Sequence, residues 1–239
     1  MMRVLFLLTG MFMGMAACAE GYTDNEIVRM LYEANGVIDA PGRSGRMARG
    51  ILENACNSDT GRFCRIVSGV ATSNDMWISR WMVSLLGAYG GREQLPLLYS
   101  LATNANTCVS ACKSMVRIEG LTTNSLAAIG ACLAVTNIDA RLQTSVCENA
   151  LLYAKESGVA GVLRTNLFER CQAYAASNTS YVVGLDESLV DFDAAYRVSK
   201  RRLSVLRLAL ERGTSPYQRN YVTNAINELV AYPESALPE

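Results

Sequence analysis

The sequence contains no histidine, only five prolines, and no excess of either charge. Without histidine, the Ser-His-Asp and Cys-His catalytic arrangements and every histidine-containing metal site are excluded. The 22 basic and 22 acidic residues give a formal net charge of zero, so no overall charge favours nucleic acid or an anionic membrane. No phosphate-binding loop, dinucleotide fingerprint or nucleophile elbow occurs. We therefore expect no cofactor, no metal site and no nucleic-acid partner.

Residues 1–19 have the three parts of a secretory signal peptide. Arg3 precedes an apolar run over residues 4–17, which is too short and too interrupted by glycine to span a membrane comfortably. Cleavage before Glu20 would release a freely secreted protein. Alternatively, residues 15–18 resemble a bacterial lipoprotein box, in which Cys18 would become the lipidated first residue. We expect an exported protein of the periplasm or cell envelope, bound to the membrane only if Cys18 is lipidated.

Apolar residues recur at helical spacing from about residue 23 onward, which predicts an all-α domain over residues 20–232. Thr23 opens a capping box at the start of the first helix, and Pro216 occupies the first position of the last helix. Pro233 ends that helix, so residues 233–239 are predicted to be a loose tail. About ten to eleven helices are expected. Their approximate ranges are 23–34, 44–56, 61–71, 74–89, 92–103, 107–118, 123–135, 140–157, 159–176, 187–212 and 216–232.

One pair of predicted helices carries a family resemblance. Residues 81–91 form an apolar helix that ends in two glycines, and residues 94–98 open the next helix with Leu-Pro-Leu-Leu. This succession resembles the repeats of the HEAT and armadillo superfamily, and the likeness covers about residues 60–231. It implies stacked antiparallel helical hairpins, an α-solenoid whose extended curved surface suits protein partners. A non-repeating helical bundle is the alternative.

Four cysteines keep a rhythm that supports a repeat. The interval from Cys108 to Cys132 equals the interval from Cys147 to Cys171. The second pair follows the first by about 39 residues, which is near the length of a helical-hairpin repeat. The midpoint of each pair falls in a predicted turn, and residues equidistant from the turn of an antiparallel hairpin lie at the same height. We therefore predict the disulfides Cys108–Cys132 and Cys147–Cys171, each across the open end of its hairpin.

Pairing is the default for cysteines of an exported chain. Cys56 and Cys64 flank an evident turn and are predicted to form a third disulfide, which leaves Cys112 as a free thiol. The rival pairing is Cys132–Cys147, because its midpoint also falls in a turn. The remaining alternative is that several of these cysteines are simply buried thiols of a helical core.

A charge gradient marks the predicted helix 187–212. Acidic residues gather near its start and basic residues follow in its later turns, an order that the helix dipole favours. We therefore interpret these charges as solvated groups that stabilise the helix rather than as a ligand site. The acidic residues are Asp186, Glu187, Asp191 and Asp193, and the basic ones are Arg197, Lys200, Arg201, Arg202, Arg207 and Arg212.

Two further sets of residues are weak candidates for binding. Arg43, Arg46 and Arg49 recur at intervals of three, so they could form an anion-binding patch on one helix face; a solvated face is the competing interpretation. Trp77 and Trp81 lie one turn apart and could stack on a sugar, but the apolar residues around them favour core packing.

These observations predict a non-catalytic protein-binding or scaffolding module of the cell envelope, whose partner is another envelope protein. One alternative is an envelope polysaccharide hydrolase or lyase that uses paired carboxylates. Another is a structural lipoprotein anchored through Cys18. Two inward carboxylates or an inward Arg–Tyr pair would favour the enzyme, whereas a continuous groove without perturbed carboxylates would favour binding.

Overall fold

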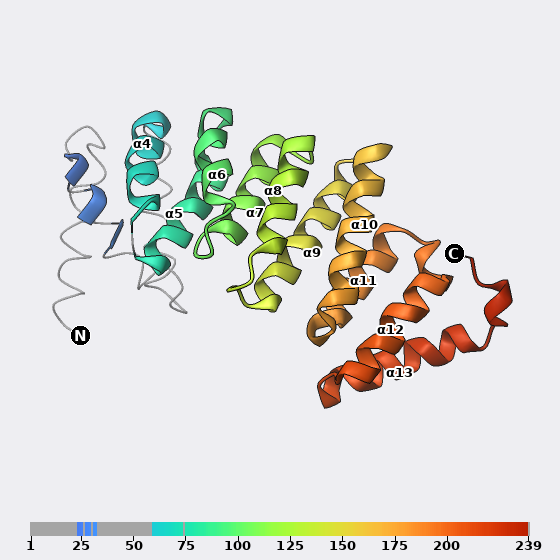
Figure 1. The fold of residues 1–239 in the computed structure, drawn as a ribbon. Coiled ribbons are helices and arrows are strands. Elements are labelled where there is room, and N and C mark those ends of the chain that lie inside the picture. The colour runs from blue at the N-terminus through green and yellow to red at the C-terminus, as the bar shows by residue number, and fades with distance from the viewer. Residues whose placement is uncertain (1–22, 26, 30, 33–58, 74, 239) are drawn as a thin grey trace, which may run out of the picture. The chain divides into compact units, whose positions relative to one another are not determined.

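A computed structural model describes residues 23–25, 27–29, 31–32, 59–73 and 75–238 (Figure 1). These residues form helices and turns, with no strand among them, and the predicted all-α architecture is confirmed. The helices are α4 (Thr60–Ala71), α5 (Met76–Tyr89), α6 (Leu95–Leu101), α7 (Cys108–Glu119), α8 (Thr123–Ala134), α9 (Ala140–Glu156), α10 (Val162–Ser177), α11 (Val182–Phe192), α12 (Lys200–Arg212) and α13 (Pro216–Val230). Short 3-10 helices are η1 (Arg92–Gln94), η2 (Thr179–Tyr181), η3 (Tyr196–Val198) and η4 (Glu234–Ala236).

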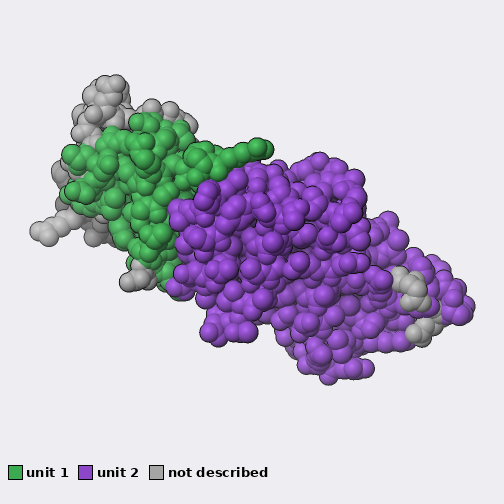
Figure 2. All heavy atoms as spheres, turned by 45° about the horizontal axis from the view of Figure 1, so that its top comes forward, with its two compact units in different colours: residues 1–94 green, residues 95–239 purple. Residues whose placement is uncertain are grey.

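The chain divides into two compact units, residues 1–94 and residues 95–239, where the sequence predicted one domain (Figure 2). Among the described residues, no helix is both long and apolar enough to cross a membrane. The predicted signal peptide and the predicted helix 44–56 lie outside the described residues.

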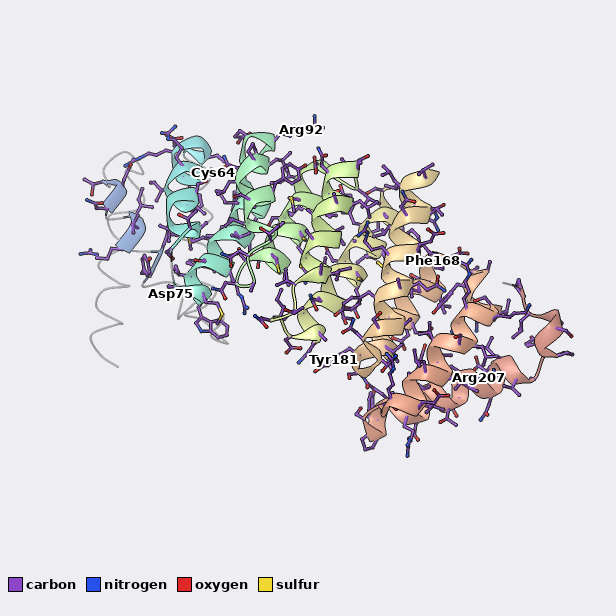
Figure 3. The ribbon with its side chains drawn as sticks, in the orientation of Figure 1. Cys64, Asp75, Arg92, Phe168, Tyr181 and Arg207 are labelled. Carbon is purple, nitrogen blue, oxygen red and sulfur yellow. The ribbon has the colours of Figure 1, made fainter. Side chains whose placement is uncertain are left out.

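In the first unit, α4 packs against α5. Asp75, labelled in Figure 3, begins α5 because its carboxylate accepts hydrogen bonds from the backbone N–H groups of Trp77 and Ile78. This start turns Ile78 into the core, whereas the Trp77 side chain is 68% exposed. Trp81 is half-buried. The sequence favoured core packing for both tryptophans, and this prediction is wrong for Trp77.

In the second unit, the helices stack as hairpins in two layers (Figure 1). Helix α7 packs against α9, α9 against α11, and α11 against α13, and these four helices are called the odd-numbered layer below. Helices α8, α10 and α12 contact one another in the same succession and form the even-numbered layer. Each hairpin joins the layers through α7–α8, α9–α10, α11–α12 and α12–α13 contacts.

Local sequence signals fix the turns and the contacts between hairpins. Gly120 ends α7 with a φ of 79°, a conformation that favours glycine, and Thr122 begins α8 with a capping box. The Gln143 amide on α9 donates to three carbonyl groups at the end of α8, and the Tyr174 hydroxyl on α10 donates to the Gln143 side-chain oxygen. This buried network joins three successive helices.

The repeat interval that the cysteine spacing predicts also relates the buried residues of the hairpin α7–α8 to those of the hairpin α9–α10. Predicted inward positions that this interval relates are buried in both hairpins at six places, which confirms that the same faces turn inward. Phe168 is the exception, because it is half-buried whereas its counterpart Ile129 is buried. The buried pairs are Cys108 with Cys147, Ala111 with Ala150, Cys112 with Leu151, Met115 with Ala154, Ala128 with Leu167, and Cys132 with Cys171.

The prediction of one continuous helix over residues 187–212 is wrong, because the chain forms α11, η3 and α12 in this region. The break lies between two capping residues. The Asp193 carboxylate accepts from the backbone N–H of Ala195, and the Ser199 hydroxyl accepts from that of Arg202 at the start of α12. The charge gradient therefore does not follow one helix dipole.

The C-terminal tail is also held more firmly than the sequence predicted. Leu237 is buried, and the backbone N–H of Lys200 donates to the carbonyl oxygen of Pro238 at 2.9 Å. These contacts fix residues 234–238 against the start of α12, so the expectation of a loose tail is corrected.

Candidate functional site

A buried ion pair joins α11 to α12. Asp186 is fully buried and accepts hydrogen bonds from Arg202, whose Nε lies 3.2 and 3.0 Å from the two carboxylate oxygens and whose Nη2 lies 2.8 Å from Oδ2. Arg202 is itself only 5% exposed and also donates to the carbonyl of Arg197. The sequence interpretation of Asp186 as a solvated helix-start charge is therefore wrong.

Two tyrosines complete the surroundings of Asp186. The Tyr221 hydroxyl of α13 donates to Oδ2 at 2.9 Å. Burial, followed by the negative charge of Asp186, raises the pKa of Tyr221 above its ordinary value. The same two causes raise the pKa of Tyr196, whose buried hydroxyl has no hydrogen-bond partner within the described part of the chain. Both phenols therefore stay protonated at neutral pH.

Arg202 and Tyr221 line a cavity of about 610 Å³ between α11 and α13, called the α11/α13 pocket below. Its polar groups include carboxylates, guanidinium groups and an amide. The lining residues are Glu187, Val190, Asp191, Ala194, Arg197, Arg202, Tyr221, Asn224, Ala225 and Glu228.

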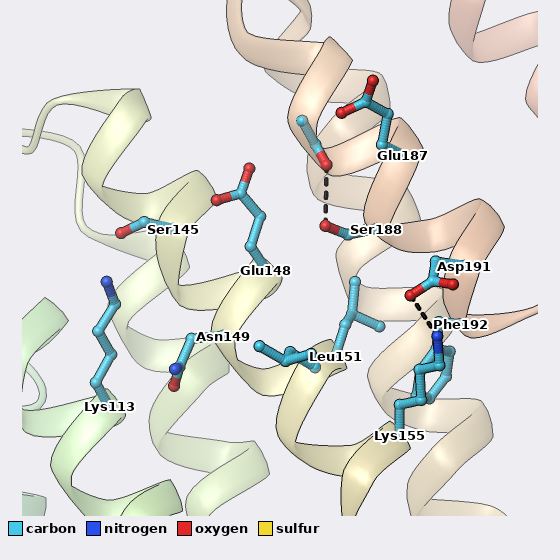
Figure 4. A pocket seen from close by; sticks show the side chains of 12 residues that line it. Lys113, Ser145, Glu148, Asn149, Leu151, Lys155, Glu187, Ser188, Asp191 and Phe192 are labelled. Atoms are coloured by element: carbon cyan, nitrogen blue, oxygen red, sulfur yellow. Dashed lines mark hydrogen bonds and ion pairs between the residues drawn. The ribbon is translucent and has the colours of Figure 1, made fainter.

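A second cavity of about 450 Å³ lies on the other side of α11, among α7, α9 and α11, and is called the α9/α11 pocket (Figure 4). Glu187 and Asp191 line both pockets, so the two cavities adjoin across α11. The remaining lining residues are Lys113, Ser145, Glu148, Asn149, Leu151, Leu152, Lys155, Gly184, Ser188 and Phe192.

The α9/α11 pocket contains incompletely compensated charges. Burial raises the pKa of Glu148; the nearby Lys113 opposes this rise, and the negative charge of Glu187 adds to it. Burial lowers the pKa of Lys113, against the effect of Glu148. Gly184 on α11 makes room for the Glu148 carboxylate, since a Cβ at this position would lie 2.5 Å from its Oε1. Figure 4 shows Glu148 and Glu187 on neighbouring helices facing the same space.

Other charges of the two pockets are already paired. Lys155 forms an exposed ion pair with Asp191 at 2.5 Å, and Arg202 is neutralised by Asp186 behind it. Three lining carboxylates then remain against two lining cations, so the combined surface has a small excess of negative charge. The carboxylates are Glu148, Glu187 and Glu228, and the cations are Lys113 and Arg197.

Four of the cysteines predicted to pair are buried thiols near their predicted partners; they are Cys108, Cys132, Cys147 and Cys171. Cys147 lies close to Cys171, and Cys132 lies close to Cys108. Cys112, predicted to be unpaired, also contacts Cys132. Both contacts lie within hairpins. However, Cys147 lies midway along α9 (Ala140–Glu156) rather than at the open end of its hairpin. The disulfide assignments themselves stay predictions.

The other predicted site residues are not brought together in the described structure. Cys64 is a buried thiol on α4, while its predicted partner Cys56 lies outside the described residues. Cys18, the proposed lipidation site, and the arginines of the anion-binding patch also lie outside them. No group of three or more Cys, Asp or Glu residues that could hold a metal ion occurs within the ranges that the structure describes.

The sequence did carry a signal for the buried ion pair. Asp186 follows Val182 by one helical turn and adjoins Leu185, so it occupies an apolar face where a carboxylate needs a partner. No comparable local signal marks Glu148, because its neighbours come from α7 and α11.

Comparisons with family models, curated proteins and solved structures find no match to this chain.

Proposed function

We propose that the protein is a non-catalytic binding or scaffolding module that holds a polypeptide partner on the odd-numbered layer of residues 95–238. The observation that carries this proposal is the continuity of the two pockets through Glu187 and Asp191. Together they provide a path over α9, α11 and α13 rather than one enclosed small-molecule cavity. A stacked-hairpin layer commonly presents such an extended surface to a protein partner.

The lining chemistry favours an extended segment with basic side chains. Lys113 compensates Glu148 only in part, and neither Glu148 nor Glu187 has an ion pair or hydrogen bond within the described ranges, so a Lys or Arg of the partner would supply further positive charge. Asn149 and Asn224 are exposed at the two pockets, and each side-chain amide can both donate to and accept from a peptide backbone.

Selection from a displayed library of random short peptides tests this specificity. We expect enrichment of peptides with Lys or Arg, and binding that weakens as salt concentration rises. In fluorescence anisotropy, Glu148→Gln combined with Glu187→Gln should weaken a selected basic peptide by about tenfold, the equivalent of about 1.4 kcal/mol.

The matched control makes the same charge change on the even-numbered layer. Glu169 on α10 and Glu211 on α12 are exposed, and replacing both by Gln should change the affinity less than about twofold, because neither lines a pocket. Equal losses for the two double variants, or a library that yields no enriched peptide, would refute this assignment of the surface.

A carboxylate-dependent hydrolase or lyase is the second candidate, favoured by the raised pKa of Glu148 beside Glu187. A carboxyl group with a raised pKa can act as a general acid while a neighbouring carboxylate stays ionised. The test is release of reducing ends or unsaturated products from cell-envelope polysaccharides. Activity that Glu148→Gln abolishes in a folded protein would establish the enzyme, and no activity on any such substrate would exclude this use of the site.

The location of the module is proposed from the sequence. Residues 1–19 support export to the periplasm or cell envelope, and membership of the HEAT and armadillo superfamily is proposed from residues 81–98. Anchoring through Cys18 is the structural-lipoprotein alternative. Mass spectrometry of the mature N-terminus separates a start at Glu20 from a lipid-modified Cys18.

A further inference from the structure

Five cysteines form a buried series through the core of residues 95–238. They occupy four consecutive helices, α7 to α10, and each is fully buried. They come from both helix layers and are buried in the core rather than lying on the surface. The five are Cys108, Cys112, Cys132, Cys147 and Cys171.

The contacts within this series are of two kinds. In the α9–α10 hairpin, Cys147 contacts Cys171, whereas its interaction with Cys132 of the preceding hairpin is electrostatic. In the α7–α8 hairpin, Cys132 contacts both Cys108 and Cys112, which lie one helical turn apart on α7. Cys112 also donates a hydrogen bond to the carbonyl of Ala128 on α8 at 3.5 Å, which keeps it at the interface of the two helices.

We propose that each of these hairpins is a site of disulfide formation, with one unique bond, Cys147–Cys171, and one exchangeable bond. In the exchangeable site, Cys132 pairs with either Cys108 or Cys112. The third thiol remains within reach and can displace the first. The structure thereby makes Cys112 a competing partner, where the spacing of the sequence left it unpaired. The proposal is independent of the peptide-binding function.

The chemistry requires an oxidant of the disulfide class, such as oxidised glutathione. The thiolate of one cysteine attacks a sulfur of the oxidant and forms a mixed disulfide. The second cysteine's thiolate then displaces the bound half, so the oxidant leaves as two thiols that take up the protons and two electrons lost by the pair. Exchange is the same displacement within the protein: the Cys112 thiolate attacks Cys132 and releases Cys108.

Burial dictates when these reactions occur. Contact with Cys171, followed by burial, raises the pKa of Cys147. For Cys132, contact with Cys108 lowers the pKa, but contact with Cys112 and burial outweigh it, and the net shift is upward. The reactive species is the thiolate, so Cys132 and Cys147, which are buried and have raised pKa values, react slowly in the folded chain. Oxidation therefore takes place while the hairpins are open, during folding.

The bonds would also restrain the α9/α11 pocket. Cys147 directly precedes Glu148, and Cys112 directly precedes Lys113. A covalent link from α10 to α9, or from α8 to α7, would restrict the helix positions that carry these two pocket charges.

Refolding the denatured chain in a buffer of reduced and oxidised glutathione tests the proposal. After free thiols are blocked with N-ethylmaleimide, peptide mapping without reduction should find Cys147 joined to Cys171, and Cys132 divided between Cys108 and Cys112. Folded product with Cys132 joined to Cys147, or with all five thiols free, would overturn the proposal. Cys132 joined to Cys108 alone would overturn the exchange.

Two further measurements separate the roles of the thiols. Cys112→Ala should move all the Cys132 bond to Cys108, while Cys64→Ala, a matched buried cysteine on α4, should leave the map of the five unchanged. A Cys112→Ala protein that folds with Cys132 unpaired would contradict the competition. The reduced, folded wild-type protein should be oxidised about 100-fold more slowly than the denatured chain; equal rates would show that opening is not required.

Discussion

Replacing Asp186 by Asn should be among the most destabilising single changes in the second unit. The substitution removes a buried negative charge but keeps the shape of the side chain. It leaves Arg202, which is 5% exposed, without its ionic partner, and it weakens the hydrogen bond from Tyr221. An uncompensated buried charge of this kind costs about 3–5 kcal/mol. Urea unfolding followed by circular dichroism, with hydrogen exchange of peptides from α11 to α13, measures the loss and locates it.

A double-mutant cycle identifies the cause. Adding Arg202→Met to Asp186→Asn should recover at least about 1 kcal/mol, because the stranded charge is removed with its partner. The exposed pair of Lys155 and Asp191 is the control, since Asp191→Asn should cost less than about 1 kcal/mol. A loss below about 1 kcal/mol for Asp186→Asn, or no recovery in the double variant, would refute the reasoning.

Three further changes have distinct expected outcomes. Glu148 has a raised pKa when folded, so its ionisation destabilises the protein as pH rises through that pKa; Glu148→Gln should therefore be more stable than wild type at pH 7, and this advantage should shrink toward pH 4 in urea titrations. Gln143→Leu leaves three carbonyls at the end of α8 without their donor and should cost about 1–3 kcal/mol in thermal unfolding, whereas an unchanged midpoint would contradict the network. Trp77→Ala should change stability by no more than about 0.5 kcal/mol because the ring is exposed, and a larger loss would show that Trp77 belongs to the core.

The apolar periodicity predicted most of the fold because its signals are local. The ranges predicted for α7, α8 and α9 lie within one residue of those observed, since capping residues and turn glycines mark their ends. The prediction failed over residues 187–212, where apolar spacing continues through the break. Asp193 and Ser199 were the available signals there, and both cap backbone groups in the structure.

The candidate site was much less predictable than the fold. Its character depends on side chains from α7, α9, α11 and α13, whose proximity no local pattern encodes. Glu148 is an ordinary helical residue in sequence, and its pKa is raised by burial and by the charge of Glu187, against the effect of Lys113. Cysteine spacing did bring the correct neighbours together, because residues equidistant from a turn meet in an antiparallel hairpin.

The most direct test of the proposed function is site-specific photo-crosslinking in the cells that produce the protein. A photoreactive residue at Asn149 or Asn224 lies on the odd-numbered layer, and one at the exposed Asn166 on α10 lies on the even-numbered layer. We predict that Asn149 and Asn224 give crosslinks to the same partner polypeptide and that Asn166 does not. Equal crosslinking from all three positions, or none from Asn149 and Asn224, would contradict the assignment of this layer as a protein-binding surface.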